Sequence, residues 1–269
     1  MPDSFMVTNK YAWDLRTGVH VDSQFYNVEQ FLQGGITLNK PELDLVGSVV
    51  DKRLLHLQCH FGLDSLSWDR LGATVTGVDI SAVAIDKARQ LNRQCKMKAN
   101  FIEGDVHGLS ELVDSNAFDF VFSSYGVTCW LSNLDVWARG IYHSLKPSGK
   151  FVLVEFHPIL DLLFNGKVSG IVNHFSDNNP VGAQTSGTYT DPQAPIKYYE
   201  YRWKHTISEI ITALVNNGFN LNCFNEYPYC PYRLFSTLDT CENGLWFSSS
   251  DRNKIPYLYS LVVEKKSVA

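Results

Sequence analysis

Short apolar runs and helix-like spacings of apolar residues alternate along the middle of the chain. Arg53–Leu57 and Thr74–Val78 are apolar enough to be buried strands, and the residues between them repeat at the spacing of a helical face. The repeat consists of Leu63, Leu66 and Leu71. Gly62 allows a close turn before this helix, and Gly72 ends it. The stretch therefore predicts a strand, a turn, a helix and a second strand that leads into Asp79.

The same alternation continues to the end of the chain, with one interruption. Further strands are predicted at Asn100–Glu103, Phe118–Ser123, Lys150–Phe156, Leu221–Tyr227 and Tyr257–Glu264. The predicted helical faces comprise Ala84, Ile85, Ala88 and Leu91, then Leu134, Trp137, Ala138, Ile141 and Leu145, then Ile207, Ile210, Ile211 and Leu214. Ser81 can cap the first of these helices, and Thr206 with Glu209 forms a possible capping box for the last. Strands that alternate with helices predict an α/β fold with a mostly parallel sheet.

Two segments lack this alternation. Residues 1–50 contain one short predicted helix, Asn27–Leu32, which Gly34 and Gly35 end, and we expect this segment to cover the core. From Pro158 to Lys204 the periodicity fails, and a stretch of this length at the carboxyl end of a strand is typical of a lid. The chain is interpreted as a single domain, 1–269, with an N-terminal cover (1–50), a core (51–157), a lid insertion (158–204) and the C-terminal part of the sheet (205–269).

Gly62 and Asp79 lie where a parallel α/β sheet binds its ligands. Such ligands sit at the carboxyl ends of the strands, between a turn at a helix N-terminus and the acid that ends the next strand. A carboxylate at Asp79 can accept hydrogen bonds from both hydroxyls of a ribose. The separation of Gly62 from Asp79 also suits a dinucleotide fold, so these two residues alone leave the nucleotide open.

The residues around this stretch are more specific. LLHLQCHFGLDSLSWDRLGATVTGVDIS resembles the first two motifs of class I S-adenosylmethionine-dependent methyltransferases, in which a glycine-rich turn holds the methionine end and a following acid holds the ribose. The resemblance continues through GDVHGL, FDFVFSS and LKPSGKFVLVEFHP, and so covers roughly Leu54 to Pro158. One departure matters. Where that family usually has an acid and three alternating glycines, this chain has His56, Gln58, His60 and Gly62.

The resemblance implies a doubly wound, mostly parallel seven-stranded sheet, S-adenosylmethionine as the cofactor, and roles for particular residues. It places the ribose at Asp79 and the adenine at Asp105, with a backbone contact from Val106. Donor and acceptor should meet at the carboxyl end of the fourth strand. The predicted cofactor contacts are Tyr26, Gln58, Cys59, His60, Gly62, Asp79, Ile80, Asp105, Val106, Ser123 and Ser124. The predicted catalytic residues are Tyr125, which follows the fourth strand, and His157, which ends the fifth.

An N-terminal extension often folds over the cofactor cleft in this family. Tyr11, Trp13 and Tyr26 are therefore candidates to touch ligand. The alternative is that these aromatic side chains only pack the extension onto the core, because aromatic residues contribute much of the burial energy in any case.

Composition narrows the function without naming it. A chain of 269 residues with 45% hydrophobic content can bury a large core. Its net charge is -5 and no run of Lys and Arg is interleaved with aromatic residues, so nucleic acid is not expected as a partner. The N-terminus lacks a secretory signal pattern and no segment is long enough to span a bilayer, which predicts a cytoplasmic protein without a membrane partner.

The cysteines do not suggest a disulfide framework or a metal site. The six are Cys59, Cys95, Cys129, Cys223, Cys230 and Cys241. They form no CxxC pair, so we expect reduced thiols. His56, Cys59 and His60 occupy neighbouring turn positions, and such residues seldom converge on a metal ion without further ligands. No bound metal is therefore expected.

Three functions remain open from the sequence. The first is methyl transfer to a small-molecule acceptor by in-line displacement, which needs alignment more than covalent machinery, and the long insertion favours an enclosed pocket. The second is a non-catalytic module that binds S-adenosylmethionine or S-adenosylhomocysteine, because the altered turn could leave binding without turnover. The third is a nicotinamide oxidoreductase. The sequence defines neither the acceptor nor the oligomeric state.

Overall fold

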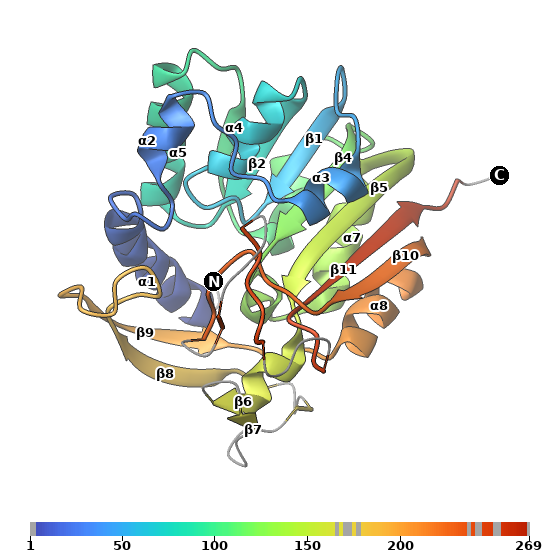
Figure 1. The fold of residues 1–269 in the computed structure, drawn as a ribbon. Helices are drawn as coiled ribbons and strands as arrows, with labels where there is room; N and C mark the ends of the chain where they lie inside the picture. The colour runs from blue at the N-terminus through green and yellow to red at the C-terminus, as the bar shows by residue number, and fades with distance from the viewer. Residues whose placement is uncertain are drawn as a thin grey trace.

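The computed structural model describes residues 4–164, 167–168, 174–175, 179–235, 238–239, 244–249 and 254–267. A seven-stranded sheet lies between two layers of helices (Figure 1). The sheet contains β1 (Arg53–Leu57), β2 (Thr74–Asp79), β3 (Asn100–Glu103), β4 (Phe118–Ser124), β5 (Leu145–Phe156), β10 (Phe219–Tyr227) and β11 (Leu258–Lys265). The helices are α1 (Ser4–His20), α2 (Val28–Leu32), α3 (Lys40–Val46), α4 (Leu63–Arg70), α5 (Ala82–Gln94), α6 (Leu109–Leu112), α7 (Leu134–Ser144) and α8 (Ile207–Asn216).

The strand order is β10-β11-β5-β4-β1-β2-β3. The five strands from β5 to β3 are parallel, and β11 runs antiparallel to both β5 and β10. The predicted seven-stranded, mostly parallel sheet is therefore confirmed. Because the carboxyl ends of parallel strands meet at one edge, the residues that follow β1 to β5 are brought together there.

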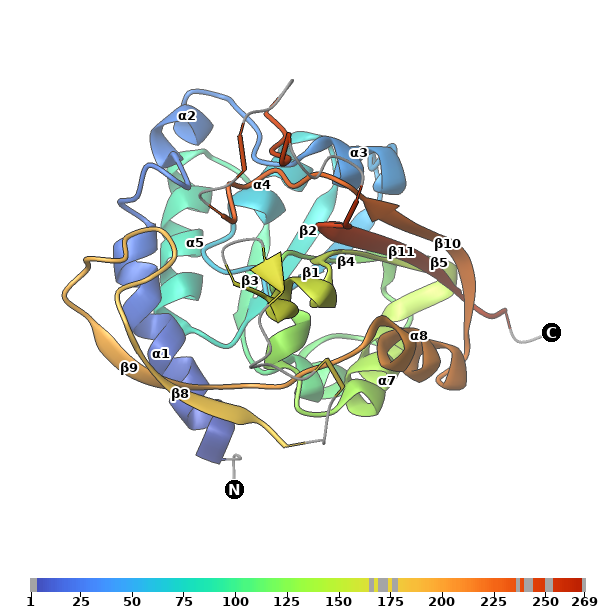
Figure 2. The same ribbon diagram turned by 60° about the horizontal axis from the view of Figure 1, so that its bottom comes forward.

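Both faces of the sheet are buried (Figure 2). One face packs against α7 and α8, where Trp137, Ile141 and Leu214 are fully buried. The other packs against α4 and α5, where Leu66 and Ile85 are fully buried. Burial from both sides explains why the central strands are continuous apolar runs rather than alternating ones.

Local capping fixes the starts of two helices as the sequence predicts. The Ser81 hydroxyl accepts a hydrogen bond from the Ala84 amide at 3.1 Å at the start of α5. Thr206 and Glu209 form the predicted capping box of α8. The largest error in a strand boundary is in β5, which begins at Leu145 rather than at Lys150, because the chain is already extended directly after α7. Other strand boundaries differ from the prediction by at most two residues.

The sequence prediction missed α1 and α3 in residues 1–50. The buried residues of α1 are largely polar: Asn9, Ala12, Arg16, Thr17 and His20. They recur at helical spacing, but an apolar pattern cannot reveal a face that is buried against polar partners. Asn9 is an example, since its side-chain amide donates to the Tyr201 carbonyl oxygen and accepts from the Tyr201 amide, both at 2.8 Å.

The segment after β5 is more regular than the sequence predicts. It contains a short 3-10 helix (Pro158–Leu162), the small pair β6 (Leu163–Phe164) and β7 (Lys167–Val168), and the antiparallel hairpin of β8 (Val181–Ser186) and β9 (Lys197–Arg202). β9 packs along α1, and Figure 1 shows the helix and the hairpin side by side at the carboxyl edge of the sheet. Cys241 lies outside the described residues. Within the described ranges, no helix is both long and apolar enough to cross a membrane.

Candidate functional site

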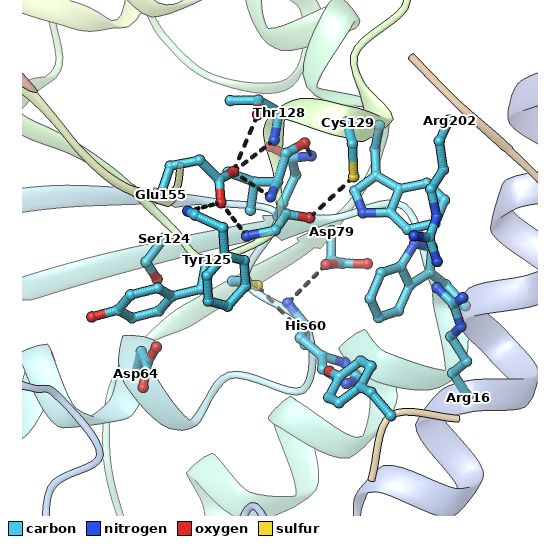
Figure 3. A pocket seen from close by; sticks show the side chains of 18 of the residues that line it. Arg16, His60, Asp64, Asp79, Ser124, Tyr125, Thr128, Cys129, Glu155 and Arg202 are labelled. Carbon is cyan, nitrogen blue, oxygen red and sulfur yellow. Dashed lines mark hydrogen bonds between the residues drawn. The ribbon is translucent and has the colours of Figure 1, made fainter. Parts of the chain in front are cut away.

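A cavity of about 1360 Å³ lies at the carboxyl edge of the sheet (Figure 3). Its floor is formed by the ends of β1, β2, β4 and β5, and its walls come from α1, the β8–β9 hairpin and the loop between β10 and β11. Single-ligand pockets usually measure roughly 300–1,000 Å³. This cleft therefore has room for two small molecules side by side.

The turn after β1 has the backbone conformation of a glycine-rich turn, although two of its three left-handed positions carry side chains. Gln58 (φ 52°), His60 (φ 51°) and Gly62 (φ 83°) all have left-handed backbone conformations, which favour glycine. A Cβ at Gly62 would lie only 2.7 Å from the Phe101 ring, so a side chain there has no space. The Gln58 side-chain amide donates to the Val127 carbonyl oxygen at 2.9 Å and so ties the turn to the loop after β4.

The His60 imidazole joins this turn to the N-terminal helix. Its Nε2 shares a hydrogen bond with Nδ1 of His20 in α1 at 2.8 Å, and the rings of Trp13 and Tyr26 meet it edge-on. Burial and the nearby Arg16 guanidinium lower the pKa of His20 to about 3, and burial also holds the pKa of His60 well below its usual range. Both imidazoles are therefore neutral at physiological pH, and one donates to the other.

Asp79 ends β2 at the edge of the cleft and is 8% exposed. One carboxylate oxygen accepts from the His60 amide at 2.7 Å and the other from the Ser81 amide at 2.9 Å. Burial raises the pKa of Asp79 to about 6. Each oxygen of an ionised carboxylate can accept a second hydrogen bond, so both remain able to receive a ligand hydroxyl.

Asp105, which follows β3, also lines the cleft. Its Oδ1 accepts from the His107 amide at 2.9 Å and is 2.8 Å from the Nδ1 atom of the same residue. Burial raises the pKa of Asp105, but the hydrogen bonds from His107 outweigh this effect and the pKa is lowered. The side chain is thus an ionised acceptor held in place by its neighbour.

Only two of the three predicted residues at the end of β4 line the cleft. Ser124 and Tyr125 line the cleft, and Tyr125 adopts a left-handed backbone conformation (φ 50°). Ser123 does not line it, because it is fully buried and its hydroxyl points to the Leu57 carbonyl oxygen at 3.5 Å. Alternation of side chains along a strand places Ser123 and Ser124 on opposite faces. The structure therefore does not support Ser123 as a cofactor contact.

His157 lines the cleft, yet both of its ring nitrogens are engaged. Nδ1 accepts from the Ile159 amide at 3.1 Å and caps the following 3-10 helix, and Nε2 pairs with Glu226 at 3.0 Å. Burial lowers the pKa of His157. Proton exchange with a ligand would require this imidazole to give up one of the two contacts.

The other predicted residues lie as follows. The cleft is lined by Tyr26, Gln58, Cys59, His60, Gly62, Asp79, Ile80, Asp105, Val106, Ser124, Tyr125 and His157, and by Trp13. Tyr11 is 60% exposed and is not part of the lining. In the part of the chain that the structure describes, no three His, Cys, Asp or Glu side chains are arranged to hold a metal ion.

The sequence gives little indication of two groups that shape the cleft. The Glu155 carboxylate is buried and accepts from the amides of Val127 and Thr128 at 2.7 and 2.9 Å, and so fixes the loop after β4. In the sequence, the only indication of this role is that Glu155 is an acidic residue within an apolar strand. The second group is Arg16 from α1 with Glu200 and Arg202 from β9, which form a charged wall on the side of the cleft away from Tyr125 (Figure 3).

An acidic group lies behind Tyr125. Glu42 in α3 is fully buried, accepts from the Asn39 side chain at 3.3 Å, and leaves its second carboxylate oxygen without a partner among the described residues. Burial, and then the charge of Asp64, raise the pKa of Glu42 to about 8. Asp64 lines the cleft and accepts from the Thr37 hydroxyl. The cleft thus has an acidic side and a basic side.

Comparison with known proteins assigns the fold and site to a family. A family model described as a methyltransferase domain matches residues 55–153. The match contains both the turn after β1 and the acids that end β2 and follow β3. Residues 55–153 thus match a methyltransferase domain, and the fold around them is that of class I S-adenosylmethionine-dependent methyltransferases.

The curated relatives of this chain are distant. It is 28% identical over 148 residues to the mitochondrial ubiquinone biosynthesis O-methyltransferase of Rattus norvegicus, covering 52% of this chain and 41% of the relative. It is 24% identical over 178 residues to methyltransferase phqN of Penicillium fellutanum, covering 65% of this chain and 48% of the relative. The chain thus matches less than half the length of these two relatives.

Solved structures agree on the fold. A putative S-adenosylmethionine-dependent methyltransferase from Listeria monocytogenes superimposes with a TM-score of 0.57 at 19% identity, over 84% of this chain and 97% of that one. Geranyl diphosphate C-methyltransferase from Streptomyces coelicolor A3(2) gives a TM-score of 0.53 at 13% identity, over 83% and 76%. At such identities the likeness concerns the fold alone.

The residues present fit the family cofactor. In the turn that holds the methionine end in this family, the buried Oε1 atom of Gln58 and Nδ1 atom of His60 have no hydrogen-bond partner among the residues that the structure describes. The buried carboxylate of Asp79 beside this turn has acceptor capacity left on both oxygens. Buried polar groups in native proteins are usually paired, so a polar ligand is expected at this turn.

Proposed function

We propose that this protein transfers the methyl group of S-adenosylmethionine to a small-molecule acceptor bound in the same cleft. The observation that carries the proposal is the turn after β1, whose three alternating left-handed residues lie beside the buried Asp79 carboxylate. This backbone is retained even though two of the three positions carry side chains. Retention of an unfavourable conformation at a ligand turn supports binding at that turn.

Asp79 would hold the ribose hydroxyls, Asp105 with the Val106 backbone the adenine, and Gln58, His60 and Gly62 the methionine end. The bound cofactor supplies the electrophilic methyl group. The chain itself contributes binding and orientation, because in-line displacement gains most from holding donor and nucleophile close and aligned.

The covering segments favour a small acceptor. α1 and the β8–β9 hairpin line the cleft opposite the sheet, and Tyr189 from that hairpin hydrogen-bonds to Tyr26. We propose that residues 158–204 act as a lid over the acceptor. Two similar proteins support a small-molecule acceptor: one is an O-methyltransferase of ubiquinone biosynthesis, and the other is a geranyl diphosphate C-methyltransferase.

Tyr125 is the proposed acceptor-side residue. Burial, and then the charge of Glu42, hold the pKa of Tyr125 well above its usual range, so its hydroxyl would donate a hydrogen bond rather than act as a base. His157 is a weaker candidate for acid or base chemistry, because both of its ring nitrogens already have partners. Alignment by Tyr125, rather than proton removal by His157, is the role we propose for this side of the cleft.

Mass spectrometry of the purified protein tests the proposal. We expect S-adenosylmethionine or S-adenosylhomocysteine to copurify, and an isotope-labelled methyl group to pass from the cofactor to a molecule in a metabolite extract. Binding without transfer to any extract would favour the non-catalytic module. Bound nicotinamide cofactor would contradict the proposal. Asp79→Asn, which removes the charge and replaces one of the two acceptor oxygens by an NH₂ donor, serves as the binding-deficient control.

A cytoplasmic location stays a prediction. The relative from Rattus norvegicus is mitochondrial, so similarity alone does not fix the compartment.

A further inference from the structure

The charged wall formed by Arg16, Glu200 and Arg202 brings two guanidinium groups to one carboxylate. Arg16 donates to one oxygen of Glu200, and Arg202 donates to the other at 2.6 Å. The side chains of Arg16 and Glu200 are 4% and 3% exposed, whereas that of Arg202 is 52% exposed. All three residues line the cleft. Two cations therefore share one anion at the inner surface of a partly enclosed site.

Aromatic rings hold both guanidinium groups in place. Arg16 and Arg202 each lie 5.3 Å from the centre of the Trp130 ring, and Arg16 also lies 4.8 Å from that of Trp13. The Tyr198 hydroxyl accepts from Arg16 at 2.8 Å. Figure 3 shows Arg16 and Arg202 approaching one another on the same side of the cleft. The arrangement is built from α1, β9 and the loop after β4, so it is fixed from three elements.

Arg202 has more N–H donors than the surrounding residues have acceptors for it. A guanidinium carries five N–H donors in a planar fork. Among the described residues, Arg202 donates to Glu200 and otherwise stacks on Trp130. Its half-exposed position in the cleft leaves the remaining donors available to a ligand. Guanidinium forks match carboxylates in a bidentate arrangement, which makes such pairs stronger than neutral hydrogen bonds.

Charge also favours a ligand with one negative charge. Arg16 and Arg202 exceed Glu200 by one positive charge. Lys204 and Asp161 line the same wall, and the Asp161 carboxylate interacts electrostatically with Arg202 first and then with Lys204. The five side chains together keep an excess of one positive charge, and an excess cation in a partly enclosed cleft favours a ligand with an anionic group.

We infer that Arg202, positioned by Glu200 and backed by Arg16, binds a carboxylate group of a ligand in the cleft. The inference rests on the proposed function for its ligands, because two of them can supply this group: the acceptor, and the methionine end of the cofactor. The chemistry recognised is the same in both cases. If the acceptor supplies the carboxylate, the affinity for the acceptor depends on Arg202. If the cofactor supplies it, the affinity for the cofactor depends on Arg202.

Calorimetry with three probes separates the sources. S-adenosylhomocysteine carries the amino-acid carboxylate, and 5′-methylthioadenosine lacks it. Benzoate, an aromatic monocarboxylate suited to Trp130, serves as an acceptor-side probe and is titrated into the protein both alone and saturated with S-adenosylhomocysteine. The variants are Arg202→Met and Arg202→Lys, with Arg139→Met as a control because Arg139 is exposed on α7 away from the cleft.

If Arg202 binds a carboxylate of the methyl acceptor, Arg202→Met should weaken benzoate binding at least tenfold and leave the affinity for S-adenosylhomocysteine unchanged. If Arg202 binds the carboxylate of the cofactor, Arg202→Met should lower the affinity for S-adenosylhomocysteine at least tenfold and leave that for 5′-methylthioadenosine unchanged. In either case Arg202→Lys should lie between Met and wild type, and Arg139→Met should match wild type. If Arg202→Met changes neither benzoate nor S-adenosylhomocysteine binding, the inference is wrong. Failure of the wild type to bind S-adenosylhomocysteine would instead contradict the proposed function, while the benzoate titration would still judge the site.

Discussion

The floor and the cover of the cleft are built in different ways. The floor is made by the ends of neighbouring strands, where Gly62, Asp79 and Asp105 lie in segments that follow one another along the chain. The cover joins residues far apart in sequence, as in the pairs Asn9 with Tyr201 and Arg16 with Glu200. Apolar burial holds the floor, whereas polar and charged contacts hold much of the cover.

This difference between floor and cover indicates where substitutions can change ligand specificity without loss of the fold. The floor packs into the two hydrophobic layers of the sheet, so a change there disturbs the core. The cover meets the floor at His60, which is hydrogen-bonded to His20 and packs edge-on against the Tyr26 ring. Exchange of covering side chains can thus alter the acceptor while the cofactor half stays intact.

The largest expected effect is at Gly62 in the floor. Gly62→Ala adds a Cβ 2.7 Å from the Phe101 ring and 2.9 Å from the Ala88 Cβ, in a left-handed conformation. We expect destabilisation of about 2–4 kcal/mol, measured as a lower urea midpoint. Gly18→Ala in the cover is the matched control: nothing lies within 4 Å of its added Cβ, so it should stabilise α1 by about 0.5–1 kcal/mol. Equal effects would remove the contrast between floor and cover.

A smaller effect is expected at Asn9 in the cover. Asn9→Ala removes two hydrogen bonds to the Tyr201 backbone, and should cost about 1–3 kcal/mol because the freed backbone groups are partly buried. The loss should release α1 from β9, so that limited proteolysis cuts the cover faster while the sheet keeps its circular dichroism. Asn222→Ala, at an exposed position, should match wild type. Uniform unfolding of Asn9→Ala would show that cover and floor form one cooperative unit.

The smallest effect is expected at Gln58, which ties two turns of the floor together. Gln58→Gly relieves a left-handed backbone worth roughly 1 kcal/mol but loses the hydrogen bond to Val127, so stability should change by less than about 1 kcal/mol. Gln58→Ala loses the same bond and keeps the strain, and should therefore be the less stable of the two. Equal stability of the two variants in thermal melts would contradict the assigned strain.

The sequence predicted the floor closely because its signals are local. β1 and β3 have the predicted bounds, and the buried side of α5 is the predicted Ala84, Ile85, Ala88 and Leu91. It missed α1 because the inward face of that helix carries Asn9, Arg16 and His20, whose partners lie up to 192 residues away. It placed Ser124 and Tyr125 in the cleft but also Ser123, which points the other way. The pairing of Arg16 with Glu200 had no local signal.

The most direct measurement is calorimetric titration of S-adenosylhomocysteine across pH into wild type and Asp79→Asn. Burial raises the pKa of Asp79 to about 6, so the carboxylate that we propose accepts the ribose hydroxyls is ionised above that pH and protonated below it. Wild-type affinity should therefore rise as pH increases through about 6 and then level off. Asp79→Asn should bind roughly 5- to 150-fold more weakly at pH 8, equivalent to about 1–3 kcal/mol, and show no step near pH 6. Absence of binding heat in the wild type, or equal affinity of the two proteins at every pH, would contradict the account.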